Sequence, residues 1–176
     1  ILDLAATLRE GDHAVALISG GASALLVAPA GNITLAEKQA VNAALLSSGA
    51  PIGEMNIVRK HLSRIKGGQL AAAAFPARLL SLMISDVPGD DPALIGSGPT
   101  VGDNSTAGDA ASILAKWNIA VPESVRDVLS NGSSVFRPDA AELQRTENRI
   151  IAAPSQSLEA AANVAKNHGC DVRTLG

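Results

Sequence analysis

Charged side chains of opposite sign are concentrated in one stretch of the chain, residues 56–100. Its first part carries four cations within eight residues, and two glycines follow them. Its second part carries three aspartates within six residues: Asp86, Asp90 and Asp91. Cations and carboxylates on glycine-rich loops are the groups that hold a phosphorylated ligand together with its metal ion. The stretch therefore predicts a site for phosphoryl chemistry.

The acidic loop is the strongest single motif. Asp86 directly follows a short apolar strand, Leu79 to Ser85, and a carboxylate in that place can coordinate Mg²⁺ or accept a hydroxyl proton. The Pro88-Gly89 turn returns Asp90 to the same edge, whereas capping of a helical turn explains Asp91. We predict catalytic and metal-binding roles for Asp86 and Asp90. The alternative is that the loop is only a turn.

The basic segment is predicted to be a helix from about Asn56 that breaks at Gly67 and Gly68. At 100° per residue, the apolar side chains share one face, and His61 falls among them as a core or interface residue. The opposite face carries Arg59, Lys60, Ser63, Arg64 and Lys66. No acidic residue of the segment balances these cations, and Lys66 lies where backbone donors are expected to be free. We predict that Lys66 is catalytic.

Three groups of residues are predicted to contact phosphate or a carboxylate. Arg59, Lys60, Gly67 and Gly68 come from the basic segment, which could also be an ordinary solvated face. Ser19, Gly20, Gly21 and Ser23 form a strand-to-helix turn that could cradle an anion or be only a tight turn. Ser97 and Thr100 lie on a second glycine-rich loop, for which a plain loop is an equal alternative. The turn that begins at Ser19 lacks the Walker and dinucleotide patterns, and Leu25 stands where a hydrolase elbow would need a glycine.

The elements that must position these residues alternate between strand and helix. Strands are expected at 14–18, 79–85, 149–153 and 171–175, and helices at 34–49, 56–66, 69–74, 105–117, 122–131 and 157–168. This order predicts a parallel, Rossmann-like α/β/α sheet. Ligands bind at the carboxyl ends of such strands. The loops at 19–23, 85–91 and 154–155 are therefore expected to converge on one edge.

The composition excludes several other functions. Hydrophobic residues make up 47% of the 176 residues, aromatic residues only 2%, and the net charge is −3, which argues against nucleic acid as a partner. The single cysteine, Cys170, excludes an internal disulfide and a cysteine-rich metal site, so a reducing, cytoplasmic location fits. No apolar run approaches the roughly 18–20 residues of a membrane span. Because the chain begins without methionine, we interpret it as a fragment.

The order of the motifs is similar to that of the class II glycerate kinases. These are glycerate 2-kinases with a C-terminal MOFRL domain, and many members are labelled hydroxypyruvate reductases of the tartrate-utilisation type. The blocks that carry the resemblance are SGGASALL at 19–26, NIVRKHLSRIKGG at 56–68, SDVPGD at 85–90 and SGPT at 97–100. The match is dense from Asp12 to Asp103. Ala22 stands where many members have a third glycine.

The resemblance implies transfer of the γ-phosphoryl group of ATP to the 2-hydroxyl of D-glycerate, with Mg²⁺, to give 2-phosphoglycerate. It implies that residues 1–176 are part of one Rossmann-like domain. An upstream segment with a lysine assigned to catalysis and the C-terminal MOFRL domain would then be missing, and the fragment alone would be inactive. The expected partners are D-glycerate, the nucleotide and the C-terminal domain, with a homo-oligomer left open.

Two alternatives remain. An NAD(P)H-dependent hydroxypyruvate reductase would need a dinucleotide fingerprint, which these residues lack. A non-catalytic anion-binding domain would have little use for the aspartates of the acidic loop.

Overall fold

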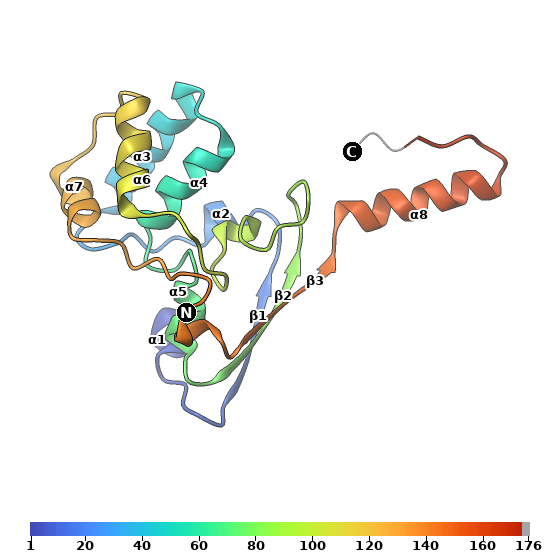
Figure 1. Ribbon diagram of the computed structural model, residues 1–176, viewed down its shortest axis with the longest axis horizontal. Helices are drawn as coiled ribbons and strands as arrows, with labels where there is room; N and C mark the ends of the chain where they lie inside the picture. The colour runs from blue at the N-terminus through green and yellow to red at the C-terminus, as the bar shows by residue number, and fades with distance from the viewer. Residues whose placement is uncertain (174–176) are drawn as a thin grey trace.

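The computed structural model describes residues 1–173, and its centre is a three-stranded parallel sheet (Figure 1). The strands β1 (His13–Ile18), β2 (Arg78–Ile84) and β3 (Thr146–Ala152) lie in the order β1-β2-β3. The parallel α/β prediction is confirmed, and β3 begins three residues before the predicted 149. Of the fourth strand predicted at 171–175, residues 171–173 form no strand and the rest lies outside the described residues.

Local sequence signals account for several helix boundaries. In α3 (Leu35–Ser48), the Thr34 hydroxyl accepts a hydrogen bond from the Glu37 amide at 3.2 Å, and the Glu37 carboxylate accepts one from the Thr34 amide at 2.7 Å. This reciprocal capping box and the left-handed Gly49 after the helix confirm the predicted boundaries. The remaining helices are α1 (Leu2–Ala5), α2 (Ala22–Leu25), α4 (Ile52–His61), α5 (Gln69–Ala74), η1 (Ile95–Ser97), α6 (Ala107–Lys116), α7 (Glu123–Ser130), η2 (Ala141–Leu143) and α8 (Pro154–Asn167). No helix of the described residues is long and apolar enough to cross a membrane.

The helix α4 differs from its prediction at both ends. It begins four residues before Asn56 and ends at His61, so the helical angles predicted for Arg64 and Lys66 are wrong. The chain beyond α4 pairs instead with residues 28–30: the Ala30 amide donates to the Leu62 carbonyl at 3.2 Å, and the Arg64 amide donates to the Ala28 carbonyl at 3.0 Å. A contact between segments more than thirty residues apart leaves no trace in helical periodicity.

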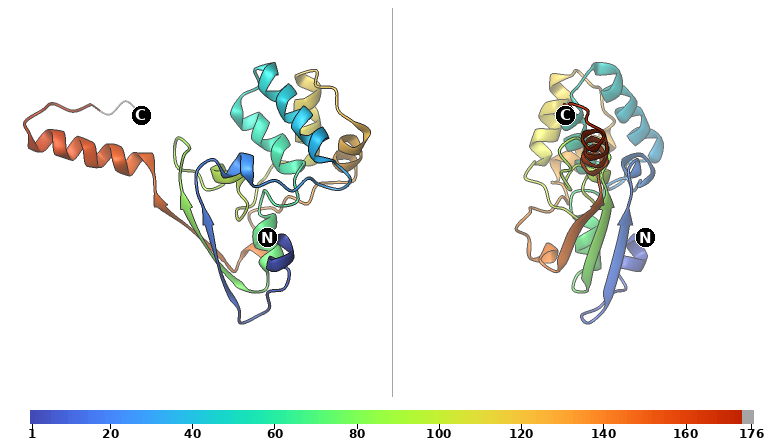
Figure 2. Two further views of the ribbon diagram at one scale, coloured as in Figure 1. Left: turned by 180° about the vertical axis from the view of Figure 1, so that it is seen from behind. Right: turned by 90° about the vertical axis from the view of Figure 1, so that its right-hand side faces the viewer.

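Two groups of helices pack in different places. The helices α1 and α5 cover one face of the sheet through a small core that includes Leu79. The helices α3, α4, α6 and α7 form a separate bundle beyond the carboxyl ends of the strands (Figures 1 and 2). Its core contains Val41, Leu45, Val58 and Val125. The bundle and the sheet edge together frame the predicted site.

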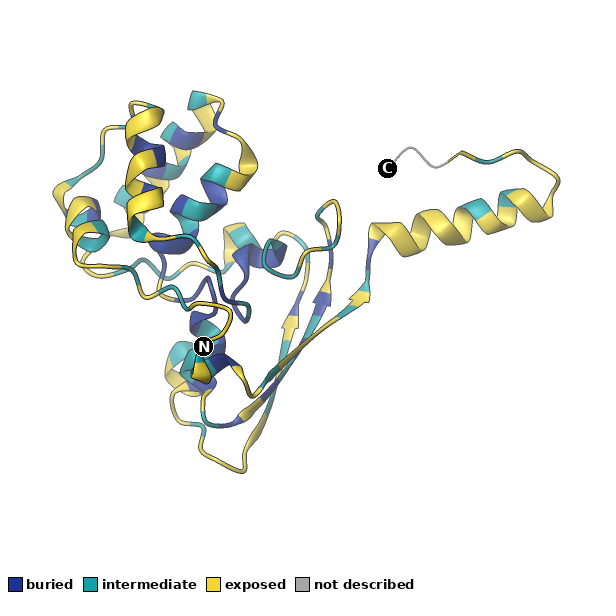
Figure 3. Cartoon of the chain, viewed as in Figure 1, coloured by how far each residue is buried: buried dark blue, intermediate teal, exposed yellow. Residues whose placement is uncertain are grey.

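The second face of the sheet carries apolar side chains that the described residues leave exposed. These side chains are Val15, Leu17, Ile84 and Ile151. The helix α8 follows β3 and projects away from the body without a buried residue, as Figure 3 shows. Within residues 1–173, helices therefore flank the sheet on one face.

We expect Leu45→Ala to lower the free energy of unfolding by about 2–5 kcal/mol, because the side chain is 1% exposed in the bundle core. The matched control is Leu46→Ala on the same helix, where the side chain is 58% exposed and the expected change is within about 0.5 kcal/mol. Urea denaturation of both variants measures the difference. An equal decrease in the free energy of unfolding for both variants would mean that Leu45 does not lie in the core of the bundle.

Candidate functional site

The three predicted loops meet at the carboxyl edge of the sheet. The Gly21 amide, after β1, donates to Asp86 Oδ2, after β2, at 2.7 Å. The Ser155 hydroxyl, after β3, donates to Asp90 Oδ2 at 2.8 Å. These hydrogen bonds join all three strand ends, as expected for parallel strands.

The turn after β1 holds Asp86 in place. A Cβ atom on Gly20 would lie 2.8 Å from the Cβ of Asp86, so only glycine permits this close approach. Gly21 is left-handed at φ 76°, and its amide is already used by the carboxylate. Ser19 is exposed, and its carbonyl accepts from Ala22 at 3.3 Å. The predicted anion cradle therefore binds the protein's own Asp86 rather than presenting that donor to a ligand.

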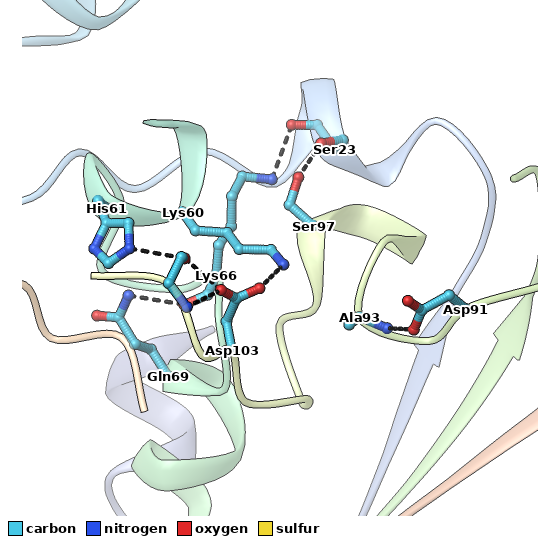
Figure 4. Close-up of polar contacts among 10 residues, drawn as sticks. Ser23, Lys60, His61, Lys66, Gln69, Asp91, Ala93, Ser97 and Asp103 are labelled. Carbon is cyan, nitrogen blue, oxygen red and sulfur yellow. Dashed lines mark hydrogen bonds and ion pairs between the residues drawn. The ribbon is translucent and has the colours of Figure 1, made fainter. Parts of the chain in front are cut away.

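A cavity of about 390 Å³ lies between α3, α4 and the turn after β1, and three cations line it. We call it the cation pocket, defined by Lys38, Arg59 and Lys66. Lys66 is 2% exposed, and its ammonium group donates to the carbonyls of Ser23 at 3.0 Å and Gly96 at 3.1 Å. Figure 4 shows the contact with Ser23.

The other two cations are also held by neutral oxygens. Lys38 Nζ donates to the Leu62 carbonyl at 2.7 Å, and Arg59 Nε donates to Asn42 Oδ1 at 2.7 Å. Among the described residues, no acidic side chain lines the cation pocket. The wall that residues 1–173 form around the pocket therefore offers its three cations no carboxylate partner, which suits an anionic ligand. Lys38 was missed by the sequence reasoning, since its predicted helix carried no other sign of a site.

The charge of the pocket is reflected in its pKa values. Burial, followed by repulsion from Lys38, Arg59 and Lys60, lowers the pKa of Lys66 to about 8. Burial alone lowers the pKa of Lys38 to about 8 and also lowers the pKa of Arg59. A bound anion would offset both the lost hydration and the repulsion.

Lys60 has a different role from the one predicted. Its buried ammonium group forms an ion pair with Asp103, and it does not line the cation pocket (Figure 4). Burial raises the pKa of Asp103, but hydrogen bonds from Lys60 and Ser105 outweigh it and lower that pKa to about 2. Asp103, interpreted from the sequence as a turn residue only, is thus the partner of Lys60. His61 is buried as predicted and lies 3.0 Å from the Ser105 hydroxyl.

Four other residues that were predicted to contact a ligand form hydrogen bonds within the protein instead. The amides of Gly67 and Gly68 donate to the carbonyls of Ser97 at 3.2 Å and Gly98 at 2.8 Å, so they are not free as the sequence suggested. The Ser97 hydroxyl lies 2.5 Å from that of Ser23. The buried Thr100 hydroxyl donates to Asn148 Oδ1 at 2.7 Å. These bonds join the loops that carry Lys66 to the sheet.

The acidic side of the site is a second cavity, of about 560 Å³, which we call the acidic groove. Asp86, Asp90, Ser155, Leu158 and Glu159 are among the residues that line it. Asp90 adopts the left-handed conformation at φ 54°, which is uncommon outside glycine. Asp91 caps the following turn, as predicted, by accepting from the Ala93 amide at 2.8 Å (Figure 4).

The two aspartates fit Mg²⁺ as part of a larger ligand set. Each uses Oδ2 in a hydrogen bond within the protein, and each Oδ1 has no hydrogen-bond partner among residues 1–173. Mg²⁺ is commonly bound by one or two carboxylates together with substrate phosphates and water. Within the part of the chain that the structure describes, no three His, Cys, Asp or Glu side chains form a metal site by themselves.

A parallel sheet with cations and carboxylates at its carboxyl edge defines a Rossmann-like α/β protein with a candidate site for an anionic ligand. Residues 1–130 match the family described as Domain of unknown function (DUF4147). The match covers well over half of the chain, and the chain belongs to this family.

The relatives are named after two different activities. A protein of Agrobacterium vitis that carries the name hydroxypyruvate reductase is 58% identical over 169 residues, which is 96% of this chain and 38% of the relative. A D-glycerate 2-kinase of Thermotoga maritima is 38% identical over 175 residues, which is 99% of this chain and 40% of the relative. The crystal structure of glycerate kinase from Thermotoga maritima has a TM-score of 0.85 at 37% identity, covering 99% of this chain and 41% of that one. The chain thus spans about two fifths of the length of these relatives.

We expect sulfate to bind the cation pocket with an affinity that falls at least about tenfold between pH 7 and pH 9.5. The sign follows from the lysines: Lys38 and Lys66 are charged below a pKa of about 8 and lose their protons above it, while sulfate stays divalent. Calorimetry at low ionic strength measures the affinity. Lys38→Met should weaken the pH dependence, and Lys116→Met, outside the pocket, should leave it unchanged. An affinity for sulfate that does not change with pH would contradict anion binding by Lys38 and Lys66.

Proposed function

We propose that the protein to which this chain belongs transfers the γ-phosphoryl group of ATP to the 2-hydroxyl of D-glycerate. The observation that carries the proposal is the arrangement of the cation pocket. Within residues 1–173, no acidic residue lines it, and one of its lining residues, Gly21, donates a hydrogen bond to Asp86. The names of the kinases from Thermotoga maritima support the reaction and its substrate. Because the chain spans about two fifths of those relatives, the activity belongs to the intact protein.

The residues of this chain divide the work of phosphoryl transfer between them. Such transfer needs in-line positioning and neutralisation of charge more than covalent chemistry. Lys38, Arg59 and Lys66 bind and orient an anionic group. Asp86, fixed by Gly21 at the rim of the pocket, accepts the proton of the attacking hydroxyl through Oδ1.

Asp90 lines the acidic groove and accepts a hydrogen bond from Ser155, in the first turn of α8. It would be the main protein carboxylate to hold Mg²⁺, while Oδ1 of Asp86 stays available for the hydroxyl proton. The metal ion, when bound with the nucleotide, would neutralise charge on the phosphate oxygens.

A hydroxypyruvate reductase is the second candidate, because the relative that is 58% identical carries that name. Hydride transfer from a nicotinamide cofactor calls for a glycine-rich dinucleotide turn, and the turn at residues 19–23 lacks that pattern. Its one left-handed glycine directs its amide to Asp86 instead.

We expect the intact protein to form phosphoglycerate from D-glycerate and ATP in the presence of Mg²⁺. A coupled assay for ADP, with the product identified by NMR, measures the reaction and the position of the new phosphate. The reductase predicts oxidation of NADH with hydroxypyruvate as the substrate. Activity in that assay without phosphoglycerate formation would exclude the kinase.

Within the kinase, Asp86→Asn should lower kcat by at least about a hundredfold, because the amide cannot accept the hydroxyl proton. The matched control on the same loop is Asp91→Asn, which replaces a carboxylate whose contact is with the Ala93 amide. This control should stay within a few fold of the unaltered enzyme. An unchanged kcat for Asp86→Asn would mean that the acidic loop is structural.

A further inference from the structure

The cation pocket and the acidic groove are linked by a hydrogen bond between a residue of one and a residue of the other. Gly21 lines the cation pocket, Asp86 lines the acidic groove, and the hydrogen bond between them is 2.7 Å long. Ligands in the two cavities would therefore approach each other at Asp86. A reaction with two substrates can use this arrangement only if each cavity takes one of them.

The two cavities differ in the charges of their lining residues, and each therefore suits a different substrate. The cation pocket has no acidic lining residue among those described and offers no carboxylate to a divalent metal ion. A nucleotide triphosphate brings Mg²⁺, which prefers oxygen ligands such as carboxylates. A small anion that carries no metal ion matches the cation pocket better.

The unused hydrogen-bond donors of the pocket match a carboxylate. An ammonium group has three N–H donors. Lys66 uses two of them on backbone carbonyls and Lys38 uses one, so both keep donors for a ligand. The guanidinium of Arg59 is fixed by Asn42 at Nε and by Asn56 at Nη1, and its Nη2 has no partner within residues 1–173. A fixed guanidinium with nearby ammonium groups recognises carboxylates well.

The acidic groove has the features that a metal-bound nucleotide needs. It is the larger of the two cavities, at about 560 Å³ against 390 Å³. Asp86 and Asp90 each keep one carboxylate oxygen that has no hydrogen-bond partner among residues 1–173. The apolar side chains of Val87, Leu158 and Ala162 also line this groove. The apolar part can pack against a base while the Asp90 carboxylate faces the metal ion, and Oδ1 of Asp86 remains for the hydroxyl proton.

From these observations we propose that the cation pocket binds the carboxylate of the acceptor acid, and that the metal-bound nucleotide enters through the acidic groove. The assignment rests on the proposed kinase function. It brings the acceptor hydroxyl and the γ-phosphoryl group together beside Asp86, where the two cavities meet. The oxygen of the acceptor hydroxyl forms the new bond to phosphorus, the bond to the ADP oxygen breaks, and the hydroxyl proton goes to Asp86.

The test is steady-state kinetics of the intact kinase with both substrates varied. Lys38→Met should raise KM for D-glycerate at least about tenfold and leave KM for ATP within about twofold. Ala162→Phe, which narrows the acidic groove, should raise KM for ATP and leave KM for D-glycerate unchanged. The matched control is Arg64→Met, because Arg64 is exposed and lines neither cavity. A rise in KM for ATP in Lys38→Met, with KM for D-glycerate unchanged, would overturn the assignment.

Two further measurements do not depend on what fraction of a variant is folded. Sulfate should inhibit the unaltered enzyme competitively against D-glycerate and not against ATP, and the reverse pattern would overturn the assignment. Glycerol is an acceptor without a carboxylate, so its kcat/KM should be the same in Lys38→Met as in the unaltered enzyme. The ratio of kcat/KM for glycerate to kcat/KM for glycerol should therefore fall about tenfold in this variant. An unchanged ratio would also contradict the binding of the acceptor carboxylate in the cation pocket. If the unaltered protein forms no phosphoglycerate, the proposed function itself fails, which is a different outcome.

Discussion

The candidate site depends on keeping three cations together without a counter-charge. Removing an ammonium group from water is costly unless its donors are satisfied. The chain meets this need for Lys66 with two backbone carbonyls, one from the turn after β1 and one from η1. Neutral oxygens satisfy the donors but leave the positive charge in place. Burial, followed by repulsion from the neighbouring cations, therefore lowers the pKa of Lys66 to about 8.

The loops around Lys66 are built to present those carbonyls. The amides of Gly67 and Gly68 bind the carbonyls of Ser97 and Gly98, which fixes the segment after Lys66 against the loop that carries Gly96. Ser97 is held in the left-handed conformation at φ 63°, which costs roughly 1–3 kcal/mol and requires support from the surrounding contacts. Its hydroxyl contact with Ser23 provides part of that support. The strain lies directly beside the buried ammonium group.

Local chemistry and strand topology were sufficient to predict one half of the site. The capping box at Thr34 and the apolar strands are visible in short windows, and the rule for parallel sheets then brings Gly21 and Asp86 to one edge. The other half depends on contacts distant in sequence. The pairing of Lys60 with Asp103 joins residues 43 positions apart, and Lys38 reaches the site only because α3 packs against α4. Neither contact leaves a periodic pattern in the sequence.

The position of Asp86 distinguishes the proposed catalytic site from a domain that only binds anions. A carboxylate at the rim of a cation pocket repels an anionic ligand and weakens its binding. The chain nevertheless uses Gly20, where any larger residue would collide with Asp86, and the amide of Gly21 to hold that carboxylate in place. A binding domain would be better without this contact. A phosphotransferase needs it, because the group that accepts the hydroxyl proton must lie next to the bound anion, where the new bond forms.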